Sequence, residues 1–468
     1  MRKPVLDMNI PASIFKAYDI RGIVDETLTE PATRAIGLAL GTLAQAAGVT
    51  QAVIGRDGRL SGARLAQALS DGFRDAGISV IDIGMVPTPL VYYATFELGT
   101  GTGVAVTGSH NPPQYNGLKM VIAGDTLHGE AIQALRRSIE AGELRLVPTE
   151  RRGGYRTIDL VPRYLERIVA DVKLARPMHV AIDCGNGVAG AVAPALFRAL
   201  GCTVSELFCE VDGHFPNHHP DPANPDNLQD LIRCLRDGDA EIGLAFDGDG
   251  DRLGVVTKGG NIIWPDRQLM LFARDVLARN PGAEIIHDVK CSRHVASYVR
   301  RHGGRPVMWR TGHSLIKAKL KESGAPLAGE MSGHMFFRER WYGFDDGLYT
   351  GARLLEILAR SDDPDRELDA LPDSPSTPEL HLPTAEGENF ELVARLQQAA
   401  VFEGATEVIT IDGVRVEYPD GFGLARASNT TPVVVIRFEA DTPAALQRIQ
   451  ADFRRAIEAV RPGVELPF

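Results

Sequence analysis

The sequence predicts an α/β protein that ends in a smaller α+β domain, and three observations lead there. Short apolar runs recur along the chain, and each ends in a turn rich in Gly, Asp or Asn. Helical stretches alternate with these runs, as in layered α/β folds. After residue 379 the pattern changes to strands separated by turns. The 468 residues are enough for about three or four domains.

The apolar runs predict buried strands, because they are short and bounded by turns. In open α/β sheets the loops at the carboxyl ends of strands hold the ligands. We therefore expect the chemistry in the turns that follow these runs. The runs stand at residues 53–54, 103–106, 180–182, 244–246 and 284–286.

The C-terminal region predicts a small antiparallel domain with one covering helix. Residues 361–379, rich in Asp, Pro and Ser, are interpreted as a linker. The helix is expected to begin with Thr442 as N-cap and Pro443 at the first helical position. The strands are predicted at residues 408–411, 414–418 and 432–438. The apolar face of the helix comprises Leu446, Ile449, Phe453, Ile457 and Val460.

The composition indicates a protein that does not act mainly on nucleic acid. Fifty Lys and Arg against 61 Asp and Glu give a net charge of −11, whereas duplex binding needs a basic surface. We predict no signal peptide in residues 1–20 and no membrane partner, since no run reaches about 20 apolar residues. The five cysteines are scattered, which favours reduced thiols and a cytoplasmic location.

The strongest motif is D-G-D-G-D-R at residues 247–252. Carboxylates at every second position, separated by glycines, allow one loop to surround a divalent cation, and Mg²⁺ prefers such oxygen ligands. The alternative is an exposed acidic turn. The position directly after an apolar strand favours a metal site formed by Asp247, Asp249 and Asp251.

The second motif is T-G-S-H-N-P-P at residues 107–113, which displays the hydroxyl of Ser109 on a stiff turn. The alternative is that its polar residues only form the turn. No Ser-His-Asp triad is implied, because the G-x-S-x-G signature is absent. Residues 314–317 match S-x-x-K, but we interpret Ser314 as a helix N-terminus because no K-T-G or S-D-N accompanies it.

Two further polar loops are suited to a phosphorylated sugar. Residues 329–334, G-E-M-S-G-H, offer a carboxylate and a hydroxyl for sugar hydroxyls. Residues 426–431, R-A-S-N-T-T, offer a guanidinium and clustered donors that suit a phosphate. Taken alone, the first could be a plain turn and the second a polar hairpin loop.

Two patterns suggest rival functions. Residues 185–190 read G-x-G-x-x-G and raise the hypothesis of a nicotinamide-dependent sugar oxidoreductase, but Asp183 is an awkward anion beside a pyrophosphate. His214, His218 and His219 with Asp221 suggest zinc, but the prolines between them favour a turn-rich loop.

Together the four loops resemble the phosphoserine, metal, sugar and phosphate loops of the α-D-phosphohexomutases, in that family's order. The similarity runs from residue 15 to the C-terminus, and Met331 favours the bacterial phosphomannomutase/phosphoglucomutase branch over phosphoglucosamine mutases, the alternative. The resemblance implies three similar α/β domains with mixed sheets and a smaller C-terminal α+β domain around one central cleft. The boundaries predicted are 1–154 for the phosphoserine domain, 155–257 for the metal domain, 258–370 for the sugar domain and 371–468 for the phosphate domain.

The resemblance also implies a mechanism. Ser109 is phosphorylated at rest and exchanges its phosphoryl group with a hexose 1- or 6-phosphate through a 1,6-bisphosphate, which also serves as primer. Mg²⁺ is held by the three aspartates with an oxygen of Ser109. Arg21, Lys119, Arg252 and His110 line the reacting phosphoryl group. Lys119, His110 and His334 are the candidates for moving the proton.

The remaining implied residues bind substrate. Glu330 and Ser332 take the 3- and 4-hydroxyls, so a site that ignores the 2-hydroxyl accepts both mannose and glucose. The phosphate that does not react is bound by Arg426, Ser428, Asn429 and Thr430. Further implied contacts are Tyr18, Arg252, Lys290, Thr311, Gly312 and His313. We expect a monomer, and a non-catalytic phosphosugar sensor is the alternative outside the enzymes.

Overall fold

The structure, a computed structural model, describes residues 10–468. Residues 1–9 lie outside the described residues, and with them the start of the predicted first domain and part of the stretch in which we predict no signal peptide. The chain forms two compact units. Unit 1 contains the residues up to Pro265, with Lys317–Gly324 and Ser332–Ala370, and unit 2 contains Asp266–Ile316, Ala325–Met331 and Leu371–Phe468.

Unit 1 begins with an α/β region built on a mixed seven-stranded sheet. Its elements are η1 (Ala12–Ile14), β1 (Ile20–Ile23), α1 (Glu30–Ala46), β2 (Gln51–Arg56), α2 (Gly62–Asp75), β3 (Ser79–Met85), α3 (Thr88–Glu97), β4 (Gly103–Val106), β5 (Tyr115–Ile122), β6 (Asp125–Thr126), α4 (Glu130–Glu140), η2 (Thr149–Arg151) and β7 (Tyr155–Thr157). The strand order is β1-β5-β4-β2-β3-β7, with β6 beside β5. Strand β2 runs parallel to β3 and β4, and β5 runs antiparallel to β4 and β1.

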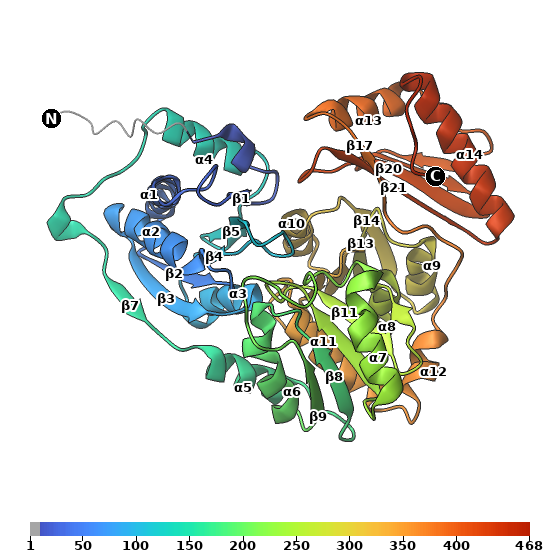
Figure 1. The fold of residues 1–468 in the computed structure, drawn as a ribbon, viewed down its shortest axis with the longest axis horizontal. Coiled ribbons are helices and arrows are strands. Elements are labelled where there is room, and N and C mark those ends of the chain that lie inside the picture. The colour runs from blue at the N-terminus through green and yellow to red at the C-terminus, as the bar shows by residue number, and fades with distance from the viewer. Residues whose placement is uncertain (1–9) are drawn as a thin grey trace. The chain divides into compact units, whose positions relative to one another are not determined.

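Helices cover both faces of this sheet (Figure 1). Ala52 and Ile54 of β2 belong to a buried core shared with α1, α2 and α4. Gly55, one step along the strand, points to the other face, where a Cβ would lie 2.7 Å from the side chain of Val91 in α3. The alternation of β2 thus produces the layered fold that the sequence predicts.

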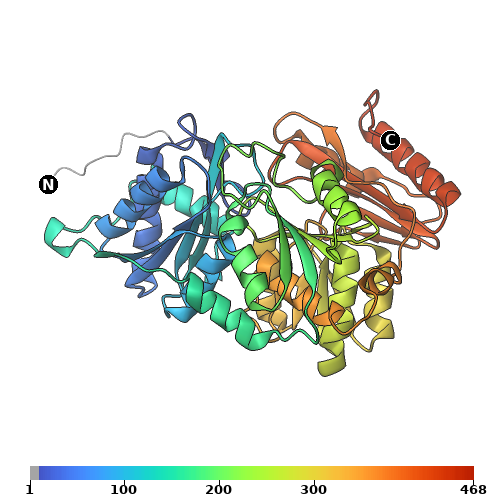
Figure 2. The same cartoon turned by 60° about the horizontal axis from the view of Figure 1, so that its bottom comes forward.

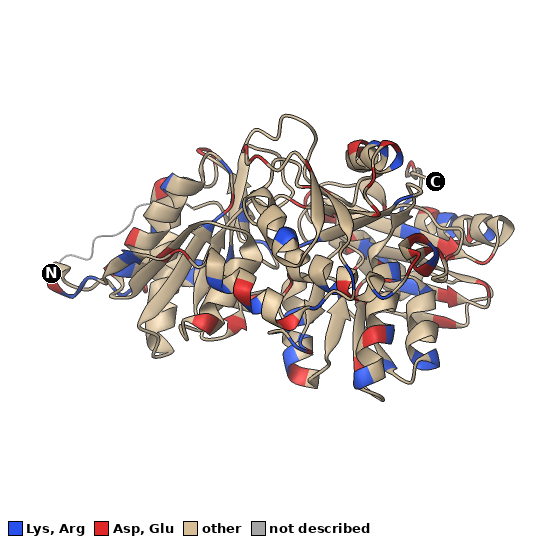
Figure 3. Ribbon diagram, turned by 90° about the horizontal axis from the view of Figure 1, so that it is seen from below, with Lys and Arg blue, Asp and Glu red and all other residues tan. Residues whose placement is uncertain are grey.

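The second α/β region of unit 1 carries a five-stranded mixed sheet of order β12-β11-β10-β8-β9. Its elements are α5 (Val161–Asp171), β8 (His179–Asp183), η3 (Val188–Ala191), α6 (Ala193–Ala199), β9 (Thr203–Leu207), η4 (Pro225–Leu228), α7 (Gln229–Asp237), β10 (Ile242–Phe246), β11 (Leu253–Thr257) and β12 (Ile262–Ile263). Leu231 and Leu235 of α7 pack on one face, against Ala181 and Ala245. Charged residues of both signs are intermixed along the outer helices (Figure 3).

Two of the predicted strands lead into a strand rather than a helix. Strand β4 pairs antiparallel with β5, and β10 pairs antiparallel with β11. The alternation that we predict after each turn is therefore wrong at these two places. The segments that follow, Tyr115–Ile122 and Leu253–Thr257, are largely buried and include β-branched residues, which suit a strand. The two chemically richest loops are thus the connections of two hairpins.

The chain from residue 265 to residue 369 contributes to both units. Its elements are α8 (Pro265–Arg279), β13 (Glu284–Asp288), α9 (Arg293–Arg301), β14 (Arg305–Trp309), α10 (His313–Ser323), β15 (Leu327–Gly329), β16 (Met335–Phe337), α11 (Gly347–Leu358) and α12 (Pro364–Asp369). In unit 2, β13 runs parallel to β14 and β15. Helix α12 lies inside the predicted linker, and Asp365 in it accepts hydrogen bonds from the backbone of Lys258 and Gly259. The linker prediction is wrong there, because these contacts hold the segment in unit 1.

The C-terminal part of unit 2 is an antiparallel sheet of order β17-β21-β20-β19-β18, covered by helices (Figure 2). Its elements are β17 (Leu380–Pro383), α13 (Glu388–Ala399), β18 (Glu407–Ile409), β19 (Val414–Tyr418), β20 (Gly421–Ala427), β21 (Val433–Ala440) and α14 (Pro443–Val460). The side chain of Thr442 accepts from the backbone N–H of Ala445 at 3.2 Å, which confirms the predicted cap. Ile449 and Phe453 are buried as predicted.

Three elements of this domain were not predicted: strand β17, strand β20 and helix α13. Strand β20 lacks a β-branched pattern because two glycines interrupt it. At Gly423 an added Cβ would lie 2.3 Å from the ring of Phe453 in α14, so the glycine allows the helix to approach the sheet. Two helices, rather than the predicted one, therefore cover this sheet.

Candidate active site

Residues 247–252 form the hairpin loop between β10 and β11, where Phe246 pairs with Leu253. Asp247, Asp249 and Asp251 are fully buried. One carboxylate oxygen from each lies within 4.8 Å of the others. Alternate positions of a tight loop thus turn three carboxylates to one point.

The electrostatics of this loop favour a bound cation. Burial and the charges of Asp251 and Asp249 raise the pKa of Asp247 well above its ordinary value. Burial acts in the same direction on Asp251, but Lys119 and His334 outweigh it and hold that pKa well below the usual range. Oδ1 of Asp249 is buried and accepts no hydrogen bond from any described residue. Because these ligands are hard oxygens, the three carboxylates fit a divalent cation such as Mg²⁺.

Ser109 lies in the loop between β4 and β5 and is buried. Its Oγ donates a hydrogen bond to Oδ2 of Asp247 at 3.1 Å. Its φ of 49° lies in the left-handed region that few residues other than Gly adopt. An added Cβ on Gly248 would lie 2.3 Å from the carbonyl oxygen of Ser109, so the glycine permits the close approach of the two loops. Two motifs distant in sequence therefore form one site.

Lys119 of β5 lies against the same carboxylates. Its Nζ donates to Oδ2 of Asp249 at 2.8 Å and to Oδ2 of Asp251 at 2.5 Å. Burial alone would lower the pKa of Lys119, but the attraction of these two carboxylates outweighs burial and raises it. The lysine therefore supplies a fixed positive charge beside Ser109.

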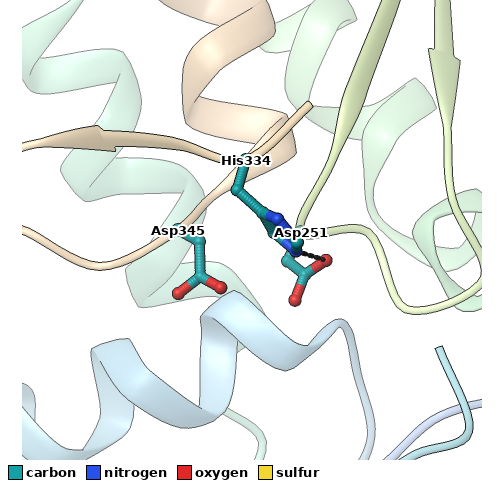
Figure 4. Close-up of side chains that lie close together, drawn as sticks. All are labelled: Asp251, His334 and Asp345. Carbon is teal, nitrogen blue, oxygen red and sulfur yellow. Dashed lines mark ion pairs between the residues drawn. The ribbon is translucent and has the colours of Figure 1, made fainter. Parts of the chain in front are cut away.

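Arg252 and His334 close another side of the loop. Nε of Arg252 lies 3.7 Å from Oδ2 of Asp247 and 3.2 Å from Nε2 of His334. His334 Nε2 forms an ion pair with Asp251 at 3.3 Å, and Figure 4 shows Asp345 beside this pair. The hydroxyl of Ser332 lies 2.8 Å from Nδ1 of His334.

Arg21 and His110 border the serine loop. Arg21 of β1 donates to the carbonyl of Gly108 at 3.3 Å and to the side chains of Asp19 and Asn111. Burial and the charges of Arg252 and Arg21 hold the pKa of His110 well below its ordinary value. Tyr18 is half-buried next to Asp19 in sequence. The residues predicted around the reacting phosphoryl group thus lie in the serine loop or the metal loop or contact one of them.

In unit 2, Asp412 joins two predicted substrate residues. It accepts from the backbone N–H of Thr311 at 2.9 Å and from Nε of Arg426 at 3.1 Å. Glu330 accepts from the backbone N–H of Gly312. Arg426 is buried near the end of β20, so its positive charge is held in place by the sheet.

The other predicted residues of unit 2 lie in the segments after β13 and β20 and at the start of α10. The Nζ of Lys290 donates to Glu379 at 2.6 Å. The Oγ of Ser428 lies 3.3 Å from the hydroxyl of Thr430, in the loop that follows β20. Asn429 lies between them in sequence, and His313 begins helix α10 and is buried.

Several residues of this site escaped sequence reasoning. Asp57 and Arg59 contact the serine loop, and the only signal was their place in a turn after a buried strand. Lys317 donates to Oδ1 of Asp345 at 2.8 Å and lies over the ring of Tyr92. The sequence marks Lys317 only as the last residue of the S-x-x-K match at residues 314–317, and the fold brings it to Asp345 and Tyr92.

The residues of the two patterns that suggested rival functions contact other groups within the protein. Asp183 accepts from the backbone N–H of Gly185 at 2.9 Å and lies 3.1 Å from His218. His219 contacts the carbonyl of His110, and His214 contacts Asp212. Each histidine thus has a different partner, and the segment is a turn-rich loop as predicted. The five cysteines, all within the described residues, are free thiols.

The fold and the site are those of a multidomain α/β protein with a carboxylate-rich loop beside a buried serine. Sequence models of the phosphoglucomutase/phosphomannomutase domains match the chain throughout: alpha/beta/alpha domains I, II and III at residues 12–145, 162–260 and 264–374, and the C-terminal domain at residues 379–456. The chain therefore belongs to the phosphoglucomutase/phosphomannomutase family, the α-D-phosphohexomutases.

Individual relatives span almost the whole chain. It is 59% identical to a phosphoglucomutase of Neisseria gonorrhoeae, over 96% of this chain and 98% of the relative. It is 55% identical to a phosphomannomutase/phosphoglucomutase of Pseudomonas aeruginosa, over 98% of each. A crystal structure of a family protein from Burkholderia thailandensis matches with a TM-score of 0.93 and 59% identity, over 98% of this chain and 100% of that one. Among residues 10–468, no helix combines the length and apolar character of a membrane span.

Proposed function

We propose that this chain interconverts the 1- and 6-phosphates of mannose and glucose through a phosphorylated Ser109 and a hexose 1,6-bisphosphate. One observation carries the proposal within this family: the Ser109 hydroxyl lies 3.1 Å from Asp247, inside the loop of three buried carboxylates. The 1,6-bisphosphate also acts as the primer that phosphorylates Ser109.

The chemistry is a pair of phosphoryl transfers. First, the bond between Ser109 Oγ and phosphorus breaks as a bond forms from phosphorus to a sugar hydroxyl oxygen, and the hydroxyl proton passes to a base. Then the phosphoryl group at the other end of the bisphosphate returns to Ser109, and a proton returns to the released sugar oxygen. His110, Lys119 and His334 are the candidates for carrying this proton.

The negative charge of the phosphoserine and the three carboxylates requires positive charge around it. A phosphoserine adds about −1.5 to −2 charges beside three carboxylates. Mg²⁺, which Asp247, Asp249 and Asp251 would hold with a phosphoserine oxygen, supplies positive charge against the phosphoryl oxygens. The cations Arg21, Lys119 and Arg252 add to this stabilisation, as phosphoryl transfer requires.

Other residues bind the rest of the substrate. The phosphate that does not react contacts Arg426, Ser428, Asn429 and Thr430, and Glu330 with Ser332 binds the 3- and 4-hydroxyls. The remaining substrate contacts are Tyr18, Arg252, Lys290, Thr311, Gly312 and His313. We also propose the domain boundaries 1–154, 155–257, 258–370 and 371–468, and a cytoplasmic monomer, a location to which the free thiols are suited.

The experiment is a side-by-side assay on mannose, glucose and glucosamine 1-phosphates with Mg²⁺ and a trace of glucose 1,6-bisphosphate. We expect conversion of the first two to 6-phosphates and little conversion of the third. A preference for glucosamine 1-phosphate would favour the phosphoglucosamine mutase, and no turnover of any would favour the sensor. Nicotinamide reduction with a sugar would favour the oxidoreductase.

A further inference from the structure

Two residues of the turn after β2 form hydrogen bonds to the serine loop, residues 107–113. Asp57 and Arg59 are both buried, and Nε of Arg59 donates to Oδ2 of Asp57 at 3.2 Å. The same carboxylate oxygen accepts from the hydroxyl of Thr107 at 2.8 Å and from the backbone N–H of Gly108 at 3.1 Å. Asp57 thus fixes the first half of the loop.

Arg59 fixes the second half. Its guanidinium donates to the carbonyl oxygens of Ser109 and Asn111 at 2.7 and 2.5 Å. It also donates to those of Pro112 and Tyr115 at 2.7 and 2.9 Å. Four carbonyls that converge on one buried guanidinium cannot shift independently, since each would lose a charge-assisted hydrogen bond.

Thr107 connects this support to the serine itself. Its hydroxyl donates to Asp57 and accepts from the backbone N–H of Ser109 at 2.8 Å. Ser109 has a φ of 49°, a strained conformation that persists only where the surrounding structure enforces it. In this backbone conformation the Ser109 hydroxyl donates its hydrogen bond to Asp247.

We propose that Asp57, Arg59 and Thr107 are positioning residues for phosphoryl transfer, which hold Ser109 in its left-handed conformation and aim its hydroxyl at the carboxylate loop. The proposal rests on the proposed function. Among the described residues, no hydrogen bond joins any of the three to Asp247, Asp249 or Asp251, or to a residue that we propose binds substrate. They therefore act on the rate of transfer rather than on substrate binding.

The test compares Thr107→Val, which keeps the shape but removes the hydroxyl, with Thr107→Ser, which restores it. Thr33→Val is the matched control, since Thr33 of helix α1 is also buried in this region and its hydroxyl donates to the carbonyl of Thr29, the N-cap of that helix. Dephosphorylated full-length enzyme is mixed with excess glucose 1,6-bisphosphate, and the appearance of phosphorylated Ser109 is followed by rapid quench and intact mass.

We expect Thr107→Val to slow phosphorylation about tenfold or more, with the KM for glucose 1-phosphate within about twofold of the wild type. Thr107→Ser should recover most of the rate, and Thr33→Val should match the wild type. Equal rates in Thr107→Val and the wild type, no recovery in Thr107→Ser, or an equal loss in Thr33→Val would overturn the proposal. Arg59→Lys, which keeps the charge but loses the fork, should behave like Thr107→Val and serves if that variant does not fold. A wild type that never becomes phosphorylated would instead refute the proposed function.

Discussion

At the scale of single residues, Asp249 contributes a buried carboxylate oxygen without a hydrogen-bond partner among the described residues. Asp249→Asn keeps the shape but removes the charge that a divalent cation needs. We expect the Mg²⁺ concentration for half-maximal activity to rise by about 10- to 100-fold or more. A magnesium titration of the isomerase rate measures this. Asp239→Asn, an exposed aspartate in the same region, is the control, and equal titration curves for the two variants would remove Asp249 from the metal site.

Arg426 presents a buried guanidinium, which we propose binds the phosphate that does not react. Arg426→Gln removes one charge-assisted contact with the phosphate that does not react. The expected result is a KM for mannose 1-phosphate about 10- to 100-fold higher, because hydrogen bonds to charged groups contribute about 1.5–3 kcal/mol. Steady-state kinetics provide the measurement. Arg448→Gln changes an exposed arginine paired with Asp420 and should leave the KM unaltered. An unchanged KM in Arg426→Gln would place the phosphate elsewhere.

At the scale of elements, the hairpin loops of two different sheets meet at Gly248. Gly248→Ala would place a Cβ 2.3 Å from the carbonyl oxygen of Ser109, so the loops must separate. We expect kcat to fall about 10- to 100-fold, since small misplacements of a reacting group are costly. Gly259→Ala is the control, because its Cβ meets only ordinary contacts beyond 3.4 Å. A fully active Gly248→Ala enzyme would contradict the close approach of the loops.

Asp346 is the N-cap of helix α11, and burial raises the pKa of its carboxyl to about 7. Asp346 accepts from the backbone N–H of Tyr349 and from the hydroxyl of Tyr164, both at 2.9 Å. Because this pKa is higher in the folded chain than in the unfolded chain, its stabilising effect is complete below about pH 4 and is lost as the pH rises through 7.

Asp346→Asn keeps the cap and removes this titration. The unfolding free energy of the variant relative to the wild type should therefore increase between pH 4 and pH 8, by up to about 4 kcal/mol at 1.36 kcal/mol per pKa unit. Urea denaturation at several pH values measures the difference. A difference independent of pH would show that Asp346 does not titrate in this range.

At the scale of the whole molecule, local motifs were predictable and long-range contacts were not. The metal loop could be predicted from the sequence because its three aspartates lie within five residues and follow an apolar strand. Strand β20 was missed because Gly421 and Gly423 serve the packing of α14 rather than a strand pattern. Asp57 and Arg59 follow the apolar run at residues 53–54, but only the fold shows that they support a loop 50 residues further along.

The same difference between local motifs and long-range contacts holds within each of the two units. Unit 1 contains Ser109, the three aspartates of residues 247–252 and the cations that contact them, from separate segments, whereas unit 2 contains Glu330 and residues 426–431. Each unit was therefore predictable in its motifs. The supporting residues, such as Asp412 in unit 2 and Asp345 in unit 1, depend on tertiary structure and carry no local signal.

The central claim is that the Ser109 hydroxyl carries the phosphoryl group during turnover. The most direct measurement is intact mass of the phosphorylated enzyme before and after mixing with excess glucose 1-phosphate, followed by recovery with glucose 1,6-bisphosphate. We predict that one phosphoryl mass is present at first, maps to Ser109, falls as the bisphosphate forms and returns with the primer. Ser109→Ala should show none of these changes and no isomerisation. Isomerisation by Ser109→Ala at the wild-type rate, or a phosphoryl mass that never moves to the sugar, would contradict the account.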